Sequence, residues 1–351
     1  MTKVNTKDDG LFGNSSKLQK SNVLSYWEKG KNGSGITVAI LDESPYIRPG
    51  IMDSDHFSAP ISSGKSATHA TNCAQVVHAV APEAKIIMLP ALNADRYKSL
   101  EWIKANSPDI ISISLKMGTD MKYVEELKKL NIPIVAAAGN NGPGRDDCAI
   151  PARYDWTICV GGFSEGTNDI YLENTSGKSM DCVAYTYINV ESKPGYSVPF
   201  SGTSAATPWL AGMLACYYTK TDKRSNLKIP DVYTLRKFIS QNCKDVRDPG
   251  KDIDSGYGLF ILPDVNTIIK EEMDMINKSE FVNNQPNKED EDMTITMNIG
   301  SNIANIDGKA VKMDTAPLVQ NGRTLVPLRF IAETLGCTVN YNSGKITIIK
   351  E

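Results

Sequence analysis

Over most of its length, the chain alternates between continuous apolar runs and stretches whose apolar residues recur at helical spacing. Continuous apolar runs are typical of buried parallel strands, and helical spacing is typical of helices that pack on a sheet. The predicted strands cover residues 35–42, 85–89, 109–115 and 132–138. The predicted helices lie around residues 23–27, 69–80, 100–104, 123–130 and 205–215. This alternation predicts an α/β fold with a mostly parallel central sheet.

The last part of the chain has a different pattern. Residues 266–292 begin as a weak amphipathic helix and end in polar and charged residues, which cannot bury enough surface to order themselves. Beyond them, short alternating segments surround one predicted helix at 327–336, with hairpin turns at 305–308 and 321–322. We therefore expect an N-terminal arm (1–34), a main domain (35–265), a linker (266–292) and a small α+β domain (293–351).

The composition narrows the class of protein. With 41% hydrophobic and 23% charged residues, the chain is typical of a soluble globular protein, and its net charge of −3 argues against nucleic acid as a partner. No run approaches the ~18 apolar residues of a membrane span, and the polar N-terminus has no signal-peptide core, so we expect a cytoplasmic protein without a membrane partner. The seven cysteines include no C-x-x-C pair. We therefore expect neither a metal nor a cofactor.

The stretch 200–215 holds a serine at a position that favours chemistry. Small residues surround Ser204, and Leu210, Met213 and Leu214 continue as a helix, so Ser204 lies in the first helical turn. Unpaired N–H groups and the positive end of the helix dipole at such a turn favour a developing oxyanion. A serine that only caps a buried helix would produce the same short pattern.

Residues 201–208, Ser-Gly-Thr-Ser-Ala-Ala-Thr-Pro, closely resemble the nucleophile motif of the subtilisin-like serine proteases. In subtilisin, an aspartate and a histidine precede the serine. Asp42 ends the first predicted strand, and His69 opens a His-Ala-Thr-Asn-Cys-Ala segment that is similar to the family's His-Gly-Thr motif. Of the other histidines, His78 faces the opposite side of the same predicted helix. We expect the third, His56, to be solvated in a charged loop.

The Ala-Ala-Ala-Gly-Asn sequence at 136–140 resembles the oxyanion-hole segment of the same family, and the resemblance extends over residues 20–265. It implies a three-layer, subtilisin-like fold and a serine endopeptidase that acts on proteins or peptides. The implied catalytic residues are Ser204 as nucleophile, His69 as general base and then acid, Asp42 as the group that orients His69, and Asn140 as the oxyanion donor.

The resemblance also implies a substrate that binds as an extended strand beside residues 112–115, with a side-chain pocket between that segment and residues 136–139. The implied substrate-binding residues are Ser112, Ser114, Leu115, Lys116, Ala137, Ala138 and Gly139. Lys116 stands where the family usually has glycine. Either its ammonium lines the pocket and favours acidic side chains at P1, or it points to solvent and only its backbone matters. Ala70 and Glu43 also depart from the family's usual residues.

Two further expectations concern folding and calcium. The 34 residues before Gly35 are too few and too polar for the folded propeptide of secreted relatives, so we expect residues 20–265 to fold alone. In many of those relatives a loop that binds calcium interrupts the helix after the catalytic histidine. The segment from His69 to Pro82 has no such loop and no carboxylate, so we expect no calcium site there.

Residues 316–336 closely resemble the small stalk domain that is named after the N-terminal part of copper amine oxidases. The name does not imply copper, because this segment has no histidine and is followed by a single cysteine, Cys337. Such domains are common on surface proteins of Gram-positive bacteria. This gives a second hypothesis for location, the cell surface or secretion by a route that the sequence does not reveal, with a cell-wall or surface partner for this domain. It also gives a second hypothesis for function, an inactive protease-like scaffold that binds or presents a partner.

Overall fold

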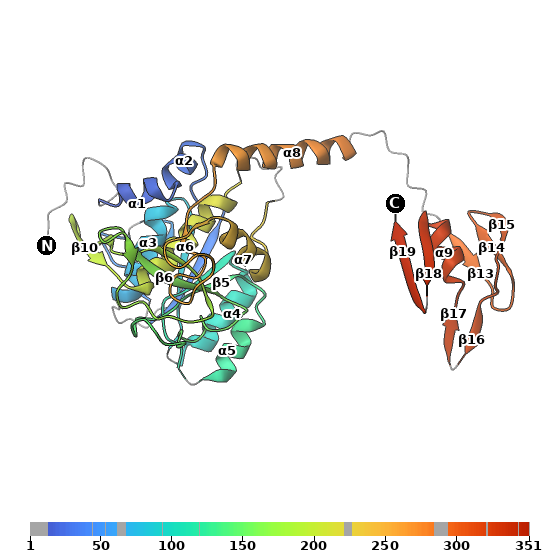
Figure 1. Ribbon diagram of the computed structural model, residues 1–351, viewed down its shortest axis with the longest axis horizontal. Coiled ribbons are helices and arrows are strands. Elements are labelled where there is room, and N and C mark those ends of the chain that lie inside the picture. Colours follow the sequence, from blue (N-terminus) through green and yellow to red (C-terminus); the bar gives the residue numbers. More distant parts are fainter. Residues whose placement is uncertain are drawn as a thin grey trace. The chain divides into compact units, whose positions relative to one another are not determined.

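The computed structural model describes residues 13–43, 45–52, 54–61, 68–92, 94–118, 120–220, 227–283, 294–320, 322–342 and 344–350. The chain forms two compact units, Met1–Asn277 and Lys278–Glu351 (Figure 1).

The helices that begin in the first unit are α1 (Ser15–Lys20), α2 (Val23–Glu28), α3 (Thr68–Val80), α4 (Arg96–Asn106), α5 (Met121–Lys128), α6 (Thr203–Tyr218), α7 (Val232–Gln241) and α8 (Val265–Asn283). Its strands are β1 (Thr37–Asp42), β2 (Phe57–Ser58), β3 (Lys85–Pro90), β4 (Ile110–Ile113), β5 (Ile134–Ala137), β6 (Ile158–Ser164), β7 (Asp169–Ile170), β8 (Met180–Tyr185), β9 (Ile188–Lys193), β10 (Tyr196–Phe200), β11 (Cys243–Lys244) and β12 (Leu259–Phe260). No helix in the described part of the chain is both long and apolar enough to cross a membrane.

One large sheet organises the first unit, with the strand order β11-β12-β8-β6-β5-β4-β1-β3-β2 and β7 paired to β6. All neighbours along this order are parallel except the β11–β12 pair at the edge. The remaining strands β9 and β10 form a separate antiparallel hairpin. The predicted α/β class with a mostly parallel sheet is therefore confirmed.

Both faces of the sheet are covered, which gives three layers. Along β1, Val38 and Ile40 belong to one hydrophobic core and Ala39 and Leu41 to another, because successive side chains of a strand point to opposite faces. The first core contains the buried residues of α3, α6 and α7, and the second contains those of α4 and α5. Burial on both faces is the reason that β1 is a continuous apolar run instead of an alternating one.

Helices α3 and α6 pack closely against one another. A side chain on Gly212 of α6 would begin 2.7 Å from the Cβ atom of Val80 on α3, so only glycine allows this approach. Pro208 lies in α6 at the position whose N–H would otherwise bond to the carbonyl of Ser204. As a result, that carbonyl is available to other donors at the start of the helix.

The N-terminal segment and α8 are part of the first unit's packing. Leu18, Val23 and Tyr26 of α1 and α2 are fully buried in the first core. The stretch 266–292, which we expected to begin as an amphipathic helix and continue as a linker, is helical as far as Asn283, since α8 spans Val265–Asn283. The first residue of this helix, Val265, belongs to the same core, whereas residues 284–293 lie outside the described residues. Residues 1–12 of the predicted arm also lie outside them.

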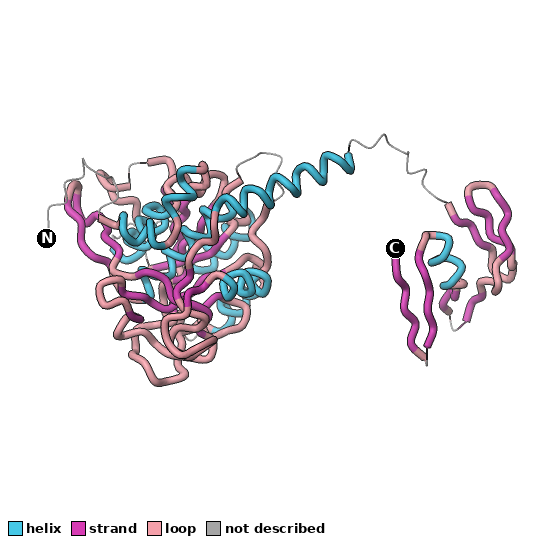
Figure 2. Tube along the Cα trace, turned by 45° about the horizontal axis from the view of Figure 1, so that its top comes forward, coloured by secondary structure: helices cyan, strands magenta, loops and turns pink. Residues whose placement is uncertain are grey.

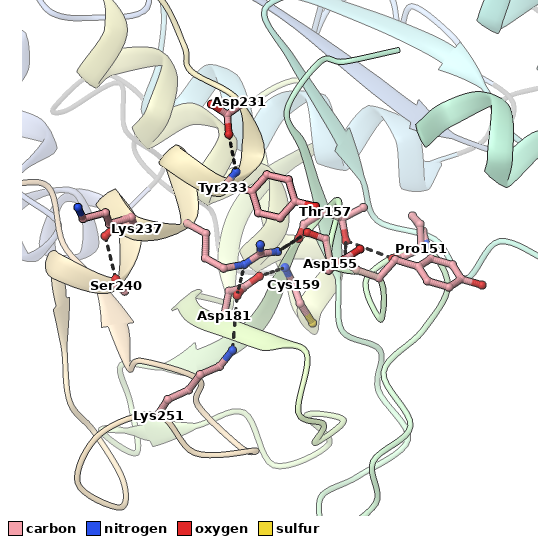
Figure 3. Close-up of polar contacts among 12 residues, drawn as sticks. Pro151, Asp155, Thr157, Cys159, Asp181, Asp231, Tyr233, Lys237, Ser240 and Lys251 are labelled. Carbon is pink, nitrogen blue, oxygen red and sulfur yellow. Dashed lines mark hydrogen bonds and ion pairs between the residues drawn. The ribbon is translucent and has the colours of Figure 1, made fainter. Parts of the chain in front are cut away.

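A buried carboxylate connects α7 to the sheet. Asp181 on β8 accepts a hydrogen bond from the main-chain N–H of Cys159, and it forms an ion pair with Arg236 of α7 at 2.8 Å. Lys251 lies 3.7 Å from the same carboxylate, and Figure 3 shows it with Asp181 and Cys159. Near them, the buried Thr157 hydroxyl donates to the carbonyl of Pro151. The main-chain N–H of Tyr257 donates to the carbonyl of Asp181 at 2.9 Å, so this hydrogen bond and the Lys251 contact hold the segment 251–257 against β8.

The second unit contains short hairpins and one described helix (Figure 2). Its elements are β13 (Ile295–Met297), β14 (Ile303–Ile306), β15 (Lys309–Lys312), β16 (Leu318–Gln320), β17 (Arg323–Leu325), α9 (Leu328–Thr334), β18 (Cys337–Asn342) and β19 (Lys345–Lys350). Strands β13–β15 form one antiparallel sheet, and β16–β17 and β18–β19 form two more. This agrees with the predicted small α+β domain.

Candidate active site

The carboxyl end of β1 places Asp42 beside the first turn of α3. Asp42 is fully buried, and its two carboxylate oxygens lie 2.8 and 2.9 Å from Nδ1 of His69, the second residue of α3. A buried carboxylate in this position fixes the tautomer of the imidazole, because Nδ1 must carry the proton that it donates. The other ring nitrogen, Nε2, then has a lone pair that can accept a proton.

The pKa of His69 is raised above its usual value. Burial of the ring acts to lower the pKa, but the hydrogen bond to Asp42 and the charge of that carboxylate together outweigh burial. The ring also packs edge-on against Phe200, with 5.5 Å between the ring centroids. The arrangement therefore stabilises an imidazolium, the form that appears when the ring accepts a proton.

The other two histidines lie elsewhere. His78, at the far end of α3, contacts Phe57 and His56, with ring centroids 4.9 and 5.7 Å away. The expectation that His56 is solvated is wrong in part, because its side chain is only 32% exposed and packs against His78. Burial and the neighbouring His56 lower the pKa of His78.

Ser204 is the second residue of α6, as its motif predicted. Its hydroxyl donates to the carbonyl of Ser114 at 3.1 Å. In return, the Ser114 hydroxyl donates to the carbonyl of Ser204 at 3.0 Å, a carbonyl that receives no helical hydrogen bond because Pro208 has no N–H. Cys73, one turn after His69 on α3, lies with its Sγ atom 3.7 Å from the same carbonyl. These contacts join the first turns of α3 and α6 to the end of β4.

Asn140 follows β5 and lies next to the start of α6. Its Oδ1 atom accepts hydrogen bonds from the main-chain N–H and the hydroxyl of Thr203, at 3.0 and 3.1 Å. Since an N–H can only donate, this contact assigns the oxygen of the amide and leaves Nδ2 as the donor. Gly202, with φ +83°, precedes the helix, and a Cβ atom there would lie 3.0 Å from that Nδ2 atom. Glycine therefore makes room for the amide.

The predicted substrate-binding residues divide into two groups. Ser112 is fully buried and paired to both β1 and β5, so it is not available to a substrate, and that part of the prediction is wrong. The sheet encloses Ser112 because β4 is a central strand. Ala137 and Ala138 are likewise almost entirely buried.

The second group follows the ends of β4 and β5. Ser114, Leu115 and Lys116 come directly after β4, and Gly139 comes after β5. Leu115 is half-buried, and Lys116 is exposed. Residues 114–116 lie beyond Ile113, the last residue of β4 that pairs with β1 and β5.

Two residues that contact the site were not singled out in the sequence. Thr203 orients Asn140, and its place directly before Ser204 in the motif was the only available signal. Cys73 lies with Sγ 4.0 Å from Nδ1 of His69, and its spacing of four residues from His69 places it on the same helix face. Sequence reasoning treated this cysteine only as a buried residue.

Among the described residues, one cluster has the residue types of a metal site, with its ligand atoms within 4.8 Å of one another. It consists of Asp42, His69 and Cys73. Their chemistry is better suited to proton transfer than to a metal. Burial and the charge of Asp42 raise the pKa of the Cys73 thiol well above its usual range, so the sulfur stays protonated. The carboxylate and Nδ1 already bond to each other.

The chain is similar to characterised proteases. The subtilase family model matches residues 33–258, and the copper amine oxidase N-terminal domain model matches residues 282–350. M-protease of Shouchella clausii (strain KSM-K16) is 29% identical over 228 residues, which cover 57% of this chain and 58% of that protein. Subtilisin Savinase of Lederbergia lenta is 29% identical over 228 residues, which cover 57% of this chain and 82% of that protein. The match thus spans a little over half the length of M-protease.

Solved structures have the same fold. The prenylagaramide maturation protease PagA has a TM-score of 0.55 at 20% identity, over 71% of this chain and 98% of that one. A lanthipeptide protease has a TM-score of 0.56 at 18% identity, over 75% of this chain and 96% of that one. At these identities the likeness concerns the fold alone. Because the family match covers well over half of the chain, and because the fold agrees with it, the protein belongs to the subtilase family.

Proposed function

We propose that the protein is a serine endopeptidase that hydrolyses peptide bonds with Ser204 as nucleophile. The observation that carries the proposal is the buried Asp42 carboxylate at 2.8 Å from Nδ1 of His69, next to a helix whose first turn holds Ser204. An aspartate, a histidine and a serine in these positions are the three members of a catalytic triad for acyl transfer. Membership of the subtilase family and the similarity to M-protease support the same reaction.

In the first half of the reaction, Nε2 of His69 removes the proton of the Ser204 hydroxyl while Oγ attacks the carbonyl carbon of the substrate. The hydroxyl must first rotate away from the carbonyl of Ser114, to which it donates in the structure. A rotation of this kind is common when substrate binds, because catalytic hydrogen bonds are often formed only in the enzyme–substrate complex. Asp42 holds Nδ1–H and stabilises the imidazolium that results.

The negative charge that develops on the substrate oxygen needs donors. Nδ2 of Asn140 and the main-chain N–H of Ser204 supply two, and the positive end of the α6 dipole adds to them. The imidazolium then protonates the leaving amine, and the acyl group stays on Ser204. Water, activated by His69 in its role as base, releases the second product and restores the serine.

The substrate backbone binds beside residues 114–116 in our proposal. The part of β4 up to Ile113 is paired on both sides, so an added strand can pair only beyond it. Ser114, Leu115 and Lys116 would form one wall of the side-chain pocket, and Gly139 would lie on the opposite wall. The exposed Lys116 is the one charged residue of this set.

Digestion of a peptide library by the wild-type protein and by the Ser204→Ala variant tests the proposal. We expect the wild type to cut peptides within the chain and the variant to cut none above background. If the wild type leaves every peptide intact, the enzymatic proposal is wrong, and the alternative of an inactive scaffold that presents the C-terminal domain takes its place. The mapped cut sites also reveal the side chain that the pocket prefers.

A further inference from the structure

Three consecutive polar residues between β7 and β8 are almost entirely buried. Asn174, Thr175 and Ser176 are 1%, 0% and 1% exposed. Burial of polar side chains is unfavourable unless their hydrogen bonds are made inside the protein. These three side chains must therefore find their hydrogen-bond partners within the protein.

Thr175 bonds to the peptide groups on both sides of Asn140. Its main-chain N–H donates to the carbonyl of Gly139 at 3.0 Å, and its hydroxyl accepts the main-chain N–H of Asn141 at 2.8 Å. Gly139 has φ +109°, and a Cβ atom there would lie 3.0 Å from Oγ1 of Thr175. The close approach of the two segments thus depends on glycine at 139 and on a hydroxyl at 175.

The two neighbours of Thr175 attach it to the rest of the unit. Asn174 accepts the N–H of Gly162 on β6 at 3.0 Å and donates to the carbonyl of Asp254 at 2.9 Å. Ser176 accepts the N–H of Gly144 at 3.0 Å and donates to the carboxylate of Asp254. Thr175 is therefore held at both ends, and it can transmit a fixed position to the loop that carries Asn140.

We propose that Thr175 is a positioning residue that sets the backbone of Asn140 for stabilisation of the transition state. The proposal rests on the function proposed above, in which Nδ2 of Asn140 binds the oxyanion. Thr203 fixes the amide plane of Asn140 through Oδ1, whereas Thr175 fixes the main chain from which that side chain extends. Both are needed, because oxyanion donors act only when they already point to the place where charge develops.

The test replaces the hydroxyl of Thr175 with a methyl group of similar shape. We expect Thr175→Val to lower kcat about tenfold or more with little change in KM. The reason is that a misplaced donor stabilises the oxyanion of the transition state less well, whereas it contributes little to binding of the substrate in the ground state. Thr175→Ser, which keeps the hydroxyl, should restore most of kcat. A peptide boronic acid, made from the best-cleaved library peptide, should lose affinity for the Val variant by a similar factor, because its adduct with serine is tetrahedral.

Two controls separate positioning from general destabilisation. Thr157→Val removes another fully buried hydroxyl, whose hydrogen-bond partners are the carbonyls of Pro151 and Tyr154 and not the peptide groups beside Asn140, and it should leave kcat unchanged (Figure 3). In the Asn140→Ala background, Thr175→Val should have almost no further effect on kcat, because a positioning residue acts only through the group that it positions.

The outcomes are distinct. A wild-type kcat in Thr175→Val, or an equal further loss in the Asn140→Ala background, overturns the positioning role and leaves the proposed function intact. Absence of any cleavage by the wild type overturns both. If Thr175→Val does not fold, Thr175→Ala is measured in its place, and the serine variant must still retain kcat for the inference to stand.

Discussion

A buried ion pair connects the N-terminal segment to α8. The Nζ atom of Lys31 lies 3.1 Å from a carboxylate oxygen of Glu272, and the two side chains are 0% and 1% exposed. The same ammonium donates to the carbonyls of Thr219 and Tyr217, at 2.5 and 3.3 Å, where α6 ends. Burial lowers the pKa of Lys31, and the interaction with Glu272 opposes this shift. The pair therefore joins three segments at one point.

We predict that Glu272→Ala is strongly destabilising. The substitution leaves a buried ammonium without its carboxylate, and removal of one partner of such a pair costs about 3–5 kcal/mol. At about 2–4 °C per kcal/mol for a domain of this size, Tm should fall by about 6–20 °C. The double variant Lys31→Met with Glu272→Leu should recover most of the loss, because apolar side chains of similar volume need no charge partner.

The assay is thermal unfolding in the Ser204→Ala background, which prevents autolysis if the protein is active. Glu126→Ala is the matched control, since Glu126 pairs with Lys104 and Lys129 at the surface, and it should barely change Tm. A Tm for Glu272→Ala no lower than that of the Glu126→Ala control would refute the reasoning. So would a double variant that is less stable than Glu272→Ala.

The same pair changes the expectation for a minimal fragment. A fragment of residues 20–265, which the sequence suggested, would lack Glu272 and bury Lys31 without its partner. It would also lack most of α8 and all of α1 except Lys20, and so would lose Leu18 from the core. We now expect residues 13–277 to give the folded enzyme, and residues 20–265 to be much less stable. Soluble yield and Tm of the two fragments compare them directly.

Four other predictions concern catalysis, the pH dependence of stability, specificity and calcium. In Asp42→Asn, kcat should fall by about 10⁴, as for the equivalent change in a serine protease triad; because the pKa of His69 is raised by that carboxylate, the acidic limb of the pH profile of kcat/KM should also move to lower pH. The pKa of His69 is higher in the folded protein than the value of about 6.5 that it has in the unfolded chain. Its contribution to stability is therefore complete at pH values below the unfolded pKa and is lost as pH rises through the folded pKa. The free energy of unfolding in urea should therefore differ between Asp42→Asn and wild type more at pH 5 than at pH 9. If Lys116 lines the pocket, Lys116→Gly should abolish a preference for acidic side chains at P1, and an unchanged P1 profile would show that the lysine points to solvent. Millimolar calcium should shift the Tm of Ser204→Ala by only a few degrees relative to chelator, because α3 is continuous from Thr68 to Val80 and offers no carboxylate; a shift of about ten degrees, or several kcal/mol at this size, would require a strong site elsewhere.

Local patterns in the sequence predicted the mostly parallel α/β fold and the position of Ser204 at the start of a helix, and the family resemblance added the three layers and the other site residues. The apolar run of β1 ends in Asp42, and the apolar helical pattern after Ser204 placed that serine in the first turn of α6, as observed. These features depend on neighbours a few residues away, because strand and helix periodicity are local properties. The resemblance of the segment that begins at His69 to the family's His-Gly-Thr motif selected this histidine as the partner of Ser204.

The tertiary structure decided what depends on residues far apart in the chain. No local pattern marks Lys31 as the partner of Glu272, or Thr175 as the residue that bonds on both sides of Asn140, because these contacts form only when separate segments meet on the folded sheet. Ser112 seemed available to substrate until the strand order placed β4 between β1 and β5 and buried it. A run of residues determines its own conformation by short-range sterics and periodicity, whereas burial and partnership are set by the topology of the whole domain.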